Sequence, residues 1–97
     1  MKKIEIIKEI AKQTAIEKHT VETVIETFMS SVKEHVINNE HVALSGFGRF
    51  TVKKRAAKMG RNIPKNIPIK VAQHFIPSFK PSKKFTRKVK KALGQAE

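Results

Sequence analysis

The 97-residue sequence contains no cysteine, no tryptophan and no tyrosine. Without cysteine the chain can form no disulfide, no thiolate metal site and no thiol nucleophile. No apolar run approaches the ~18 residues that a membrane-spanning segment needs, and the N-terminal residues lack the apolar block of a signal peptide. We therefore expect a soluble, intracellular protein. Its length fits one domain, because domains usually have roughly 50–250 residues.

Carboxylates are missing from most of the second half of the chain. Residues 1–40 contain 6 basic and 7 acidic residues, whereas residues 41–97 contain 15 basic residues and a single acid, Glu97. The formal net charge of +13 is therefore concentrated after residue 40. A surface built only for solubility normally mixes both signs. This uneven distribution predicts a surface that binds a polyanion.

The inventory of reactive groups argues against catalysis. Residues 41–96 hold no acid, and no serine lies in a pattern that pairs it with a histidine and an acid. The four histidines lack the spacing of metal ligands. Gly46 and Gly48 are not followed by the Gly-Lys-Ser/Thr of a nucleotide-binding loop. We expect no enzyme activity, no cofactor and no metal site.

Apolar residues in the first part of the chain recur at helical spacing. A first stripe consists of Ile4, Ile7, Ile10 and Ala11. A second, stronger stripe consists of Val21, Val24, Ile25, Phe28, Val32 and Val36. A break is expected within residues 15–18. The second helix is expected to end at Asn38-Asn39, since asparagine tolerates the left-handed cap conformation. This pattern predicts an antiparallel helical hairpin.

After residue 40 the apolar period changes to two. Alternation over residues 42–44 and 50–52, around glycines 46 and 48, predicts two short strands joined by a turn. Residues 53–70 lose most apolar content, which is typical of a disordered linker or an exposed hairpin with its tip near residues 64–66. Alternation resumes over residues 67–75 and favours the hairpin. A final basic helix is expected to open at Pro81 or Ser82.

Three segments carry a resemblance to a known family. Residues 46–50 (Gly-Phe-Gly-Arg-Phe), 60–62 (Gly-Arg-Asn) and 76–80 (Ile-Pro-Ser-Phe-Lys) match in order and spacing the bacterial HU/IHF family, which the chain resembles over its whole length. The resemblance implies a single α+β domain over residues 1–97 and an intertwined dimer. A helical dimerisation body (1–40) would precede a three-stranded antiparallel saddle with a long β-arm (41–80) and a short basic C-terminal helix (81–97).

The resemblance also implies that paired β-arms enter the DNA minor groove and insert an apolar wedge, as HU and IHF do. Arginine suits the negative potential of a narrow minor groove, and asparagine can bond to base edges there. The residues expected to contact DNA are Arg49, Lys53, Lys54, Arg55, Lys58, Arg61, Asn62, Ile63, Pro64, Lys65, Lys70, Lys80, Lys83, Lys84 and Arg87.

The expected arm tip departs from the family pattern. Family members usually carry the intercalating proline directly after Arg-Asn, whereas here Ile63 stands in that place and Pro64 follows. Either Ile63 replaces the proline, which keeps the family spacing from Gly60 and is slightly favoured, or the tip shifts and Pro64 inserts. A third interpretation is a tip that only touches sugar edges and bends DNA weakly.

Phenylalanines allow two interpretations. They could be stacking platforms for single-stranded bases. Packing in a dimer core is favoured, because they occupy apolar positions of helix and strand patterns. The residues expected in that core are Phe28, Val32, Phe47, Phe50 and Phe79.

The favoured function is largely sequence-independent binding and bending of double-stranded DNA by a homodimer that compacts the nucleoid in the cytoplasm. Bent, nicked or gapped DNA should bind more tightly, because bending intact duplex costs on the order of 1–10 kcal/mol. The partner chain could instead be a paralogue. The alternatives are a site-selective bender like IHF, or a basic protein that binds any polyanion, such as RNA or an anionic membrane. The favoured function involves no membrane.

Overall fold

The structure is a computed structural model that describes residues 1–62 and 67–94, with the backbone alone for residues 58–62 and 67–71. The chain divides into two compact units, residues 1–35 and residues 36–97. The first unit holds helix α1 (Lys3–Thr14) and most of helix α2 (Lys18–Ile37). None of the helices in the described ranges is long and apolar enough to cross a membrane.

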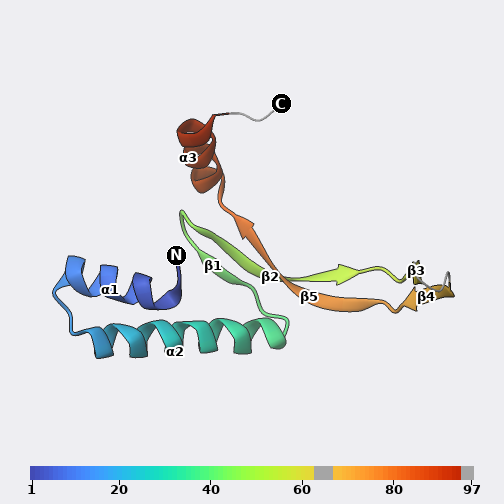
Figure 1. The fold of residues 1–97 in the computed structure, drawn as a ribbon, viewed down its shortest axis with the longest axis horizontal. Coiled ribbons are helices and arrows are strands. Elements are labelled where there is room, and N and C mark those ends of the chain that lie inside the picture. The colour runs from blue at the N-terminus through green and yellow to red at the C-terminus, as the bar shows by residue number, and fades with distance from the viewer. Residues whose placement is uncertain (63–66, 95–97) are drawn as a thin grey trace. The chain divides into compact units, whose positions relative to one another are not determined.

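Helices α1 and α2 form the antiparallel hairpin that the apolar stripes predict (Figure 1). The break falls where the sequence predicts it, because Ala15 takes the left-handed conformation with φ of 59° and ends α1. Helix α2 ends at Ile37, and Asn39 follows with φ of 60°, which confirms the predicted stop. Ile7 of α1 and Val21 of α2 are the buried hydrophobic side chains of this unit within the described ranges.

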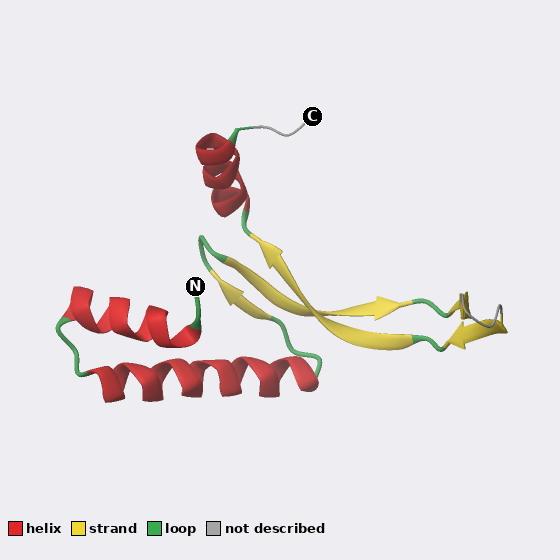
Figure 2. Ribbon diagram, viewed as in Figure 1, coloured by secondary structure: helices red, strands yellow, loops and turns green. Residues whose placement is uncertain are grey.

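The second unit is built on one long hairpin (Figure 2). Strands β1 (Val42–Leu44), β2 (Gly48–Arg55) and β5 (His74–Pro81) form an antiparallel sheet in the order β1-β2-β5, and β3 (Lys58–Asn62) pairs with β4 (Ile67–Val71). The structure thus confirms the three-stranded sheet and favours the hairpin over the disordered linker.

One pairing register runs through both parts of this hairpin. Arg55 lies opposite His74, and after two unpaired residues on each strand Lys58 lies opposite Val71. The interruption at Ala56-Ala57 and Ala72-Gln73 therefore contains two residues on each strand and leaves the pairing register unchanged.

Helix α3 (Lys83–Leu93) is held to the turn before β2 through its N-cap residue, Ser82. The Ser82 hydroxyl accepts a hydrogen bond from the Phe85 amide at 3.1 Å, which caps the helix, and the Ser82 amide donates to the Phe47 carbonyl at 2.9 Å. Serine is a favoured N-cap residue because its oxygen satisfies an otherwise unpaired helix amide. The predicted final helix is confirmed, but it begins at Lys83, because Ser82 is its N-cap and Pro81 is the last residue of β5.

Gly48 allows the sheet and an aromatic ring to approach closely. A Cβ atom at this position would lie 2.5 Å from Cζ of Phe79 and 2.7 Å from the backbone oxygen of Lys80. Such distances are shorter than van der Waals contact, so only glycine fits between the β2 backbone and the ring.

We predict that Gly48→Ala lowers the free energy of unfolding by about 1–3 kcal/mol, the usual cost of overpacking. The measurement is urea denaturation at fixed protein concentration. Gly46→Asn is the control, because Gly46 has φ of 79° with open space around it and asparagine tolerates that conformation. A cost at Gly46 as large as at Gly48 would contradict the clash.

The helical hairpin carries an exposed ion pair, in which Lys3 Nζ donates to Glu26 Oε1 at 2.9 Å. This hydrogen bond, then the Glu26 charge and more weakly that of Glu22, raise the pKa of Lys3 above its ordinary value of 10.5. Because the pKa of Lys3 is higher in the folded state than in the unfolded state, the ion pair stabilises the folded protein at pH values below the unfolded-state pKa. That contribution is lost as the pH rises through the folded-state pKa.

We predict that Glu26→Gln returns the pKa of Lys3 toward 10.5, measured by NMR titration of the Lys3 side chain. Glu22→Gln is the matched control and should lower this pKa less, because Glu22 acts through its charge alone. Equal changes in the two variants would show that the hydrogen bond is not the main cause.

Candidate nucleic-acid interface

The register of β2 with β5 decides which side chains share a face of the sheet. Residues directly opposite each other in an antiparallel pair point to the same side, and neighbours along a strand point to opposite sides. Phe50 pairs with Phe79, and their ring centroids lie 4.9 Å apart, so both rings are on one face. Arg49 pairs with Lys80 and therefore lies on the other.

The face opposite the rings is called here the cationic face. Its successive pairs join Arg49 to Lys80, Thr51 to Ser78, Lys53 to Ile76 and Arg55 to His74. The four cationic side chains are exposed to solvent, while Thr51 and Ser78 are half-buried between them. The face thus presents charged groups at both ends and two hydroxyl groups in the middle, all groups that can bond to phosphate oxygens.

Nothing on these strands neutralises the cationic face. Like charges directly opposite each other destabilise a sheet, yet Arg49 and Lys80 occupy such a pair. A carboxylate at either position would relieve the repulsion, but the sequence has none between residues 41 and 96. An anion lying across the two strands would relieve it equally well.

The second face of the sheet is called here the aromatic face. Phe50, Phe79 and Phe47 form a continuous cluster in which the Phe47 and Phe79 centroids are 5.2 Å apart. The cluster is not enclosed, because Phe47 remains 46% exposed and Phe79 38%. Toward the arm the same face carries Lys54 opposite Phe75. Lys54 is therefore separated from the other predicted contacts of β2.

Helix α3 extends the positive charge of this unit. Its cations are Lys83, Lys84, Arg87, Lys88, Lys90 and Lys91, and its first turn contains no acid. Like charges spaced three or four residues apart destabilise a helix by about 0.2–0.5 kcal/mol per pair, and cations at a helix N-terminus oppose its dipole. A bound anion would offset both effects.

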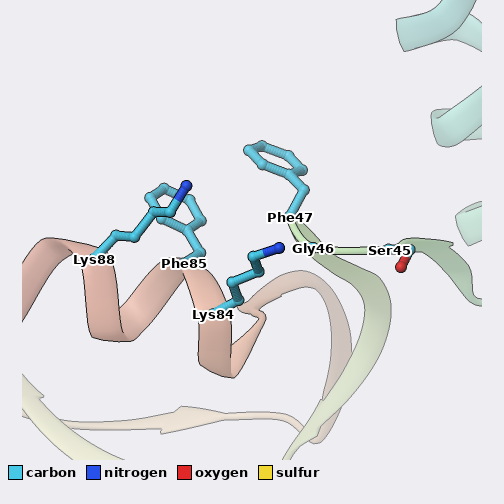
Figure 3. A pocket seen from close by; sticks show the side chains of 6 residues that line it. All are labelled: Ser45, Gly46, Phe47, Lys84, Phe85 and Lys88. Carbon is cyan, nitrogen blue, oxygen red and sulfur yellow. The ribbon is translucent and has the colours of Figure 1, made fainter.

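An open cavity of about 480 Å³ lies between α3 and the turn before β2, lined by Ser45, Gly46, Phe47, Lys84, Phe85 and Lys88. The rings of Phe47 and Phe85 stack at 5.6 Å. Figure 3 shows Lys84 extending from α3 toward this turn. The turn thus links the aromatic cluster to the basic helix.

The other predicted contacts are distributed along the arm. Lys58, Arg61 and Asn62 belong to β3 and Lys70 to β4, where the structure describes the backbone alone. Ile63, Pro64 and Lys65 lie outside the described residues. Phe28 and Val32 belong to α2, in the first unit, where Phe28 is exposed and Val32 half-buried. No group of three metal-ligating side chains occurs among the described residues.

Comparisons with known proteins agree with this geometry. The sequence profile of the family described as "Bacterial DNA-binding protein" matches residues 1–90. The chain is 36% identical to the DNA-binding protein HU of Thermotoga maritima over 90 residues, which is 93% of this chain and all of that protein. It belongs to the HU/IHF family.

Members of both branches of the HU/IHF family are similar to the chain. The integration host factor subunit beta of Halorhodospira halophila is 32% identical, with 99% of this chain and 95% of that protein covered. A cocrystal structure of Anabaena HU with DNA superposes with a TM-score of 0.87 at 29% identity, covering 92% of this chain and 97% of that one. The chain is thus similar to HU and to IHF at comparable identity.

The cationic face holds side chains that are not among the predicted DNA contacts. Thr51 and Ser78 lie between its charged ends, and alternation from Arg49 and Lys80 would have placed them there. His74 was considered only as a metal ligand, whereas it lies opposite Arg55. Lys88 lines the cavity beside α3, and its helical spacing from Lys84 was the available signal.

We predict that Lys80→Gln raises the free energy of unfolding at low salt by a few tenths to about 1 kcal/mol, because it removes the repulsion with Arg49. The gain should vanish near 1 M salt, where the Debye length is about 3 Å. Lys54→Gln is the matched control, since Lys54 faces Phe75. An equal gain in Lys54→Gln would show that net charge, and not the opposed pair, matters.

Proposed function

We propose that the protein is an architectural, largely sequence-independent double-stranded DNA-binding protein that bends DNA and compacts the nucleoid. The observation that carries this proposal is the cationic face, with Arg49 opposite Lys80 and no carboxylate between residues 41 and 96. A polyanion would neutralise the charges of such a surface along its whole length. The similarity to an HU chain crystallised with DNA supports double-stranded DNA as that polyanion.

The proposed functional form is a homodimer. Among the residues whose side chains are described, Ile7 and Val21 are the only hydrophobic ones that are buried, and the aromatic cluster is half-exposed. A chain of 97 residues can enclose only a thin core. A second copy that covers Phe28, Val32, Phe47, Phe50 and Phe79 would complete it. A paralogue could replace that copy.

In this proposal each predicted segment of the chain has its own role. Residues 1–40 would form the dimerisation body, residues 41–80 the saddle and arm, and residues 81–97 a basic flank. The cationic face and α3 would bind phosphates, while Arg61, Asn62 and the residue at position 63 or 64 would enter the minor groove. An apolar wedge kinks DNA by unstacking one base step.

A site-selective bender is the second candidate, because an IHF subunit is 32% identical to the chain. Phosphate contacts alone do not distinguish sequences, so selectivity would have to come from base contacts or from DNA deformability. An affinity ratio of ~10³ or more between one site and random DNA would identify this function.

The test is energy transfer between dyes at the two ends of a random-sequence duplex of about 35 base pairs, titrated with protein at several salt concentrations. Transfer should rise on binding. If about eight phosphates are neutralised, the slope of log affinity against log salt should be near −7. Equal binding to RNA duplex without any rise in transfer would contradict the proposal and indicate a general polyanion binder.

The same assay tests the wedge. Ile63→Ala should lower the energy transfer at saturation with little change in affinity, since the wedge bends DNA and phosphates supply most of the binding energy. Pro64→Ala distinguishes insertion at the next residue. Ile16→Ala is the matched control, because Ile16 is an exposed isoleucine between α1 and α2. Wild-type transfer in both arm variants would contradict intercalation.

A further inference from the structure

The cationic face ends toward the arm at a histidine. His74 is the first residue of β5 and lies directly opposite Arg55, the last residue of β2. Its side chain is exposed, and the ladder is interrupted immediately beyond it. The opposite end of the face has two permanent cations, Arg49 and Lys80, whereas this end has one cation and an imidazole.

A hydrogen bond determines which nitrogen of His74 can take up a proton. Nδ1 lies 2.9 Å from the backbone oxygen of Ala72. A carbonyl oxygen only accepts, so Nδ1 carries the hydrogen and Nε2 is the unprotonated nitrogen of the neutral ring. Protonation therefore occurs at Nε2. It adds a positive charge and a second donor without breaking the bond to Ala72.

The groups around His74 favour an external anion as the partner of this donor. Arg55 faces it from β2, and Lys53 lies on the same face one pair further along. On β5 the next residue of the face is Ile76, and neither strand carries a carboxylate. A phosphate that bridges Arg55 and His74 would accept a hydrogen bond from Nε2 when the imidazole is protonated.

We propose that His74 is a further DNA contact, which binds a backbone phosphate through Nε2 only when the imidazole is protonated. This inference rests on the proposed function, because it requires DNA on the cationic face. Histidine changes charge within about pH 5–8. DNA binding and proton binding are then linked reciprocally, so binding takes up protons and mild acidity tightens the complex.

The experiment measures the affinity for the 35-base-pair duplex at pH 7.5 and 5.5 over several salt concentrations. Wild-type affinity should rise at pH 5.5 by about eightfold at 0.1 M salt for each contact formed, with a salt slope steeper by about 0.9. His74→Gln should lose this increment. His74→Lys should bind at pH 7.5 as tightly as the wild type does at pH 5.5.

His19→Gln is the matched control, because His19 is an exposed histidine of α2, in the first unit. It should keep the full pH effect. Calorimetry in buffers of different ionisation enthalpy should show proton uptake on binding by the wild type and less uptake by His74→Gln. Circular dichroism at both pH values establishes that each variant is folded.

The outcomes separate this inference from the function on which it rests. Salt-dependent DNA binding with the same pH effect in wild type and His74→Gln would overturn the histidine contact and leave the proposed function intact. Absence of salt-dependent DNA binding by the wild type at both pH values would overturn both. A pH effect lost equally in His19→Gln and His74→Gln would show a general charge effect and overturn the contact.

Discussion

The pairing of β2 with β5 is the constraint on which the rest of the second unit depends. Because the side-chain period of a strand is two, one register assigns every phenylalanine of these strands to one face and Arg49, Lys53, Arg55 and Lys80 to the other. A slip of one residue would mix the two sets. Gly48 helps to hold this register, since the Phe79 ring lies against its backbone.

Each face of this sheet carries an unfavourable feature that a binding partner would relieve. The aromatic face leaves Phe47 and Phe79 partly exposed to water, and the cationic face opposes like charges. Each costs free energy in an isolated chain, the first through the hydrophobic effect and the second through repulsion. The two faces are complementary to different partners, an apolar surface and a polyanion. In the proposed dimer, the two faces of one sheet would therefore take two different partners.

Local sequence patterns predict the helices and strands of this chain better than they predict how the strands pair. Two helices, the break before Lys18, the strands around Gly46 and the final basic helix all follow from local patterns. The opposition of Arg49 and Lys80 does not, because it depends on where the hairpin reverses. A tip centred one residue later would have paired different side chains. The interruption beside Ala56-Ala57 also has no local signal, since equal gaps on both strands leave the alternation intact.

The same contrast between local pattern and strand pairing holds for the described residues of the candidate site. The charge asymmetry after residue 40 identified the polyanion-binding half, but charge alone could not assign Lys54 to the aromatic face. Thr51, Ser78 and His74 were missed because uncharged polar residues give no signal in a charge count. Their positions opposite and between cations became visible only with the register.

The pairing register is the same on both sides of the unpaired residues Ala56-Ala57 and Ala72-Gln73. This constancy also limits how the long hairpin can change length during evolution. A single inserted residue in one strand would offset every later pair, so residues must be gained or lost on both strands together. One residue per strand would still reverse which face the distal segment presents relative to the base. Arms that keep their distal face can therefore differ only in steps of two residues per strand, or about 6.6 Å of reach.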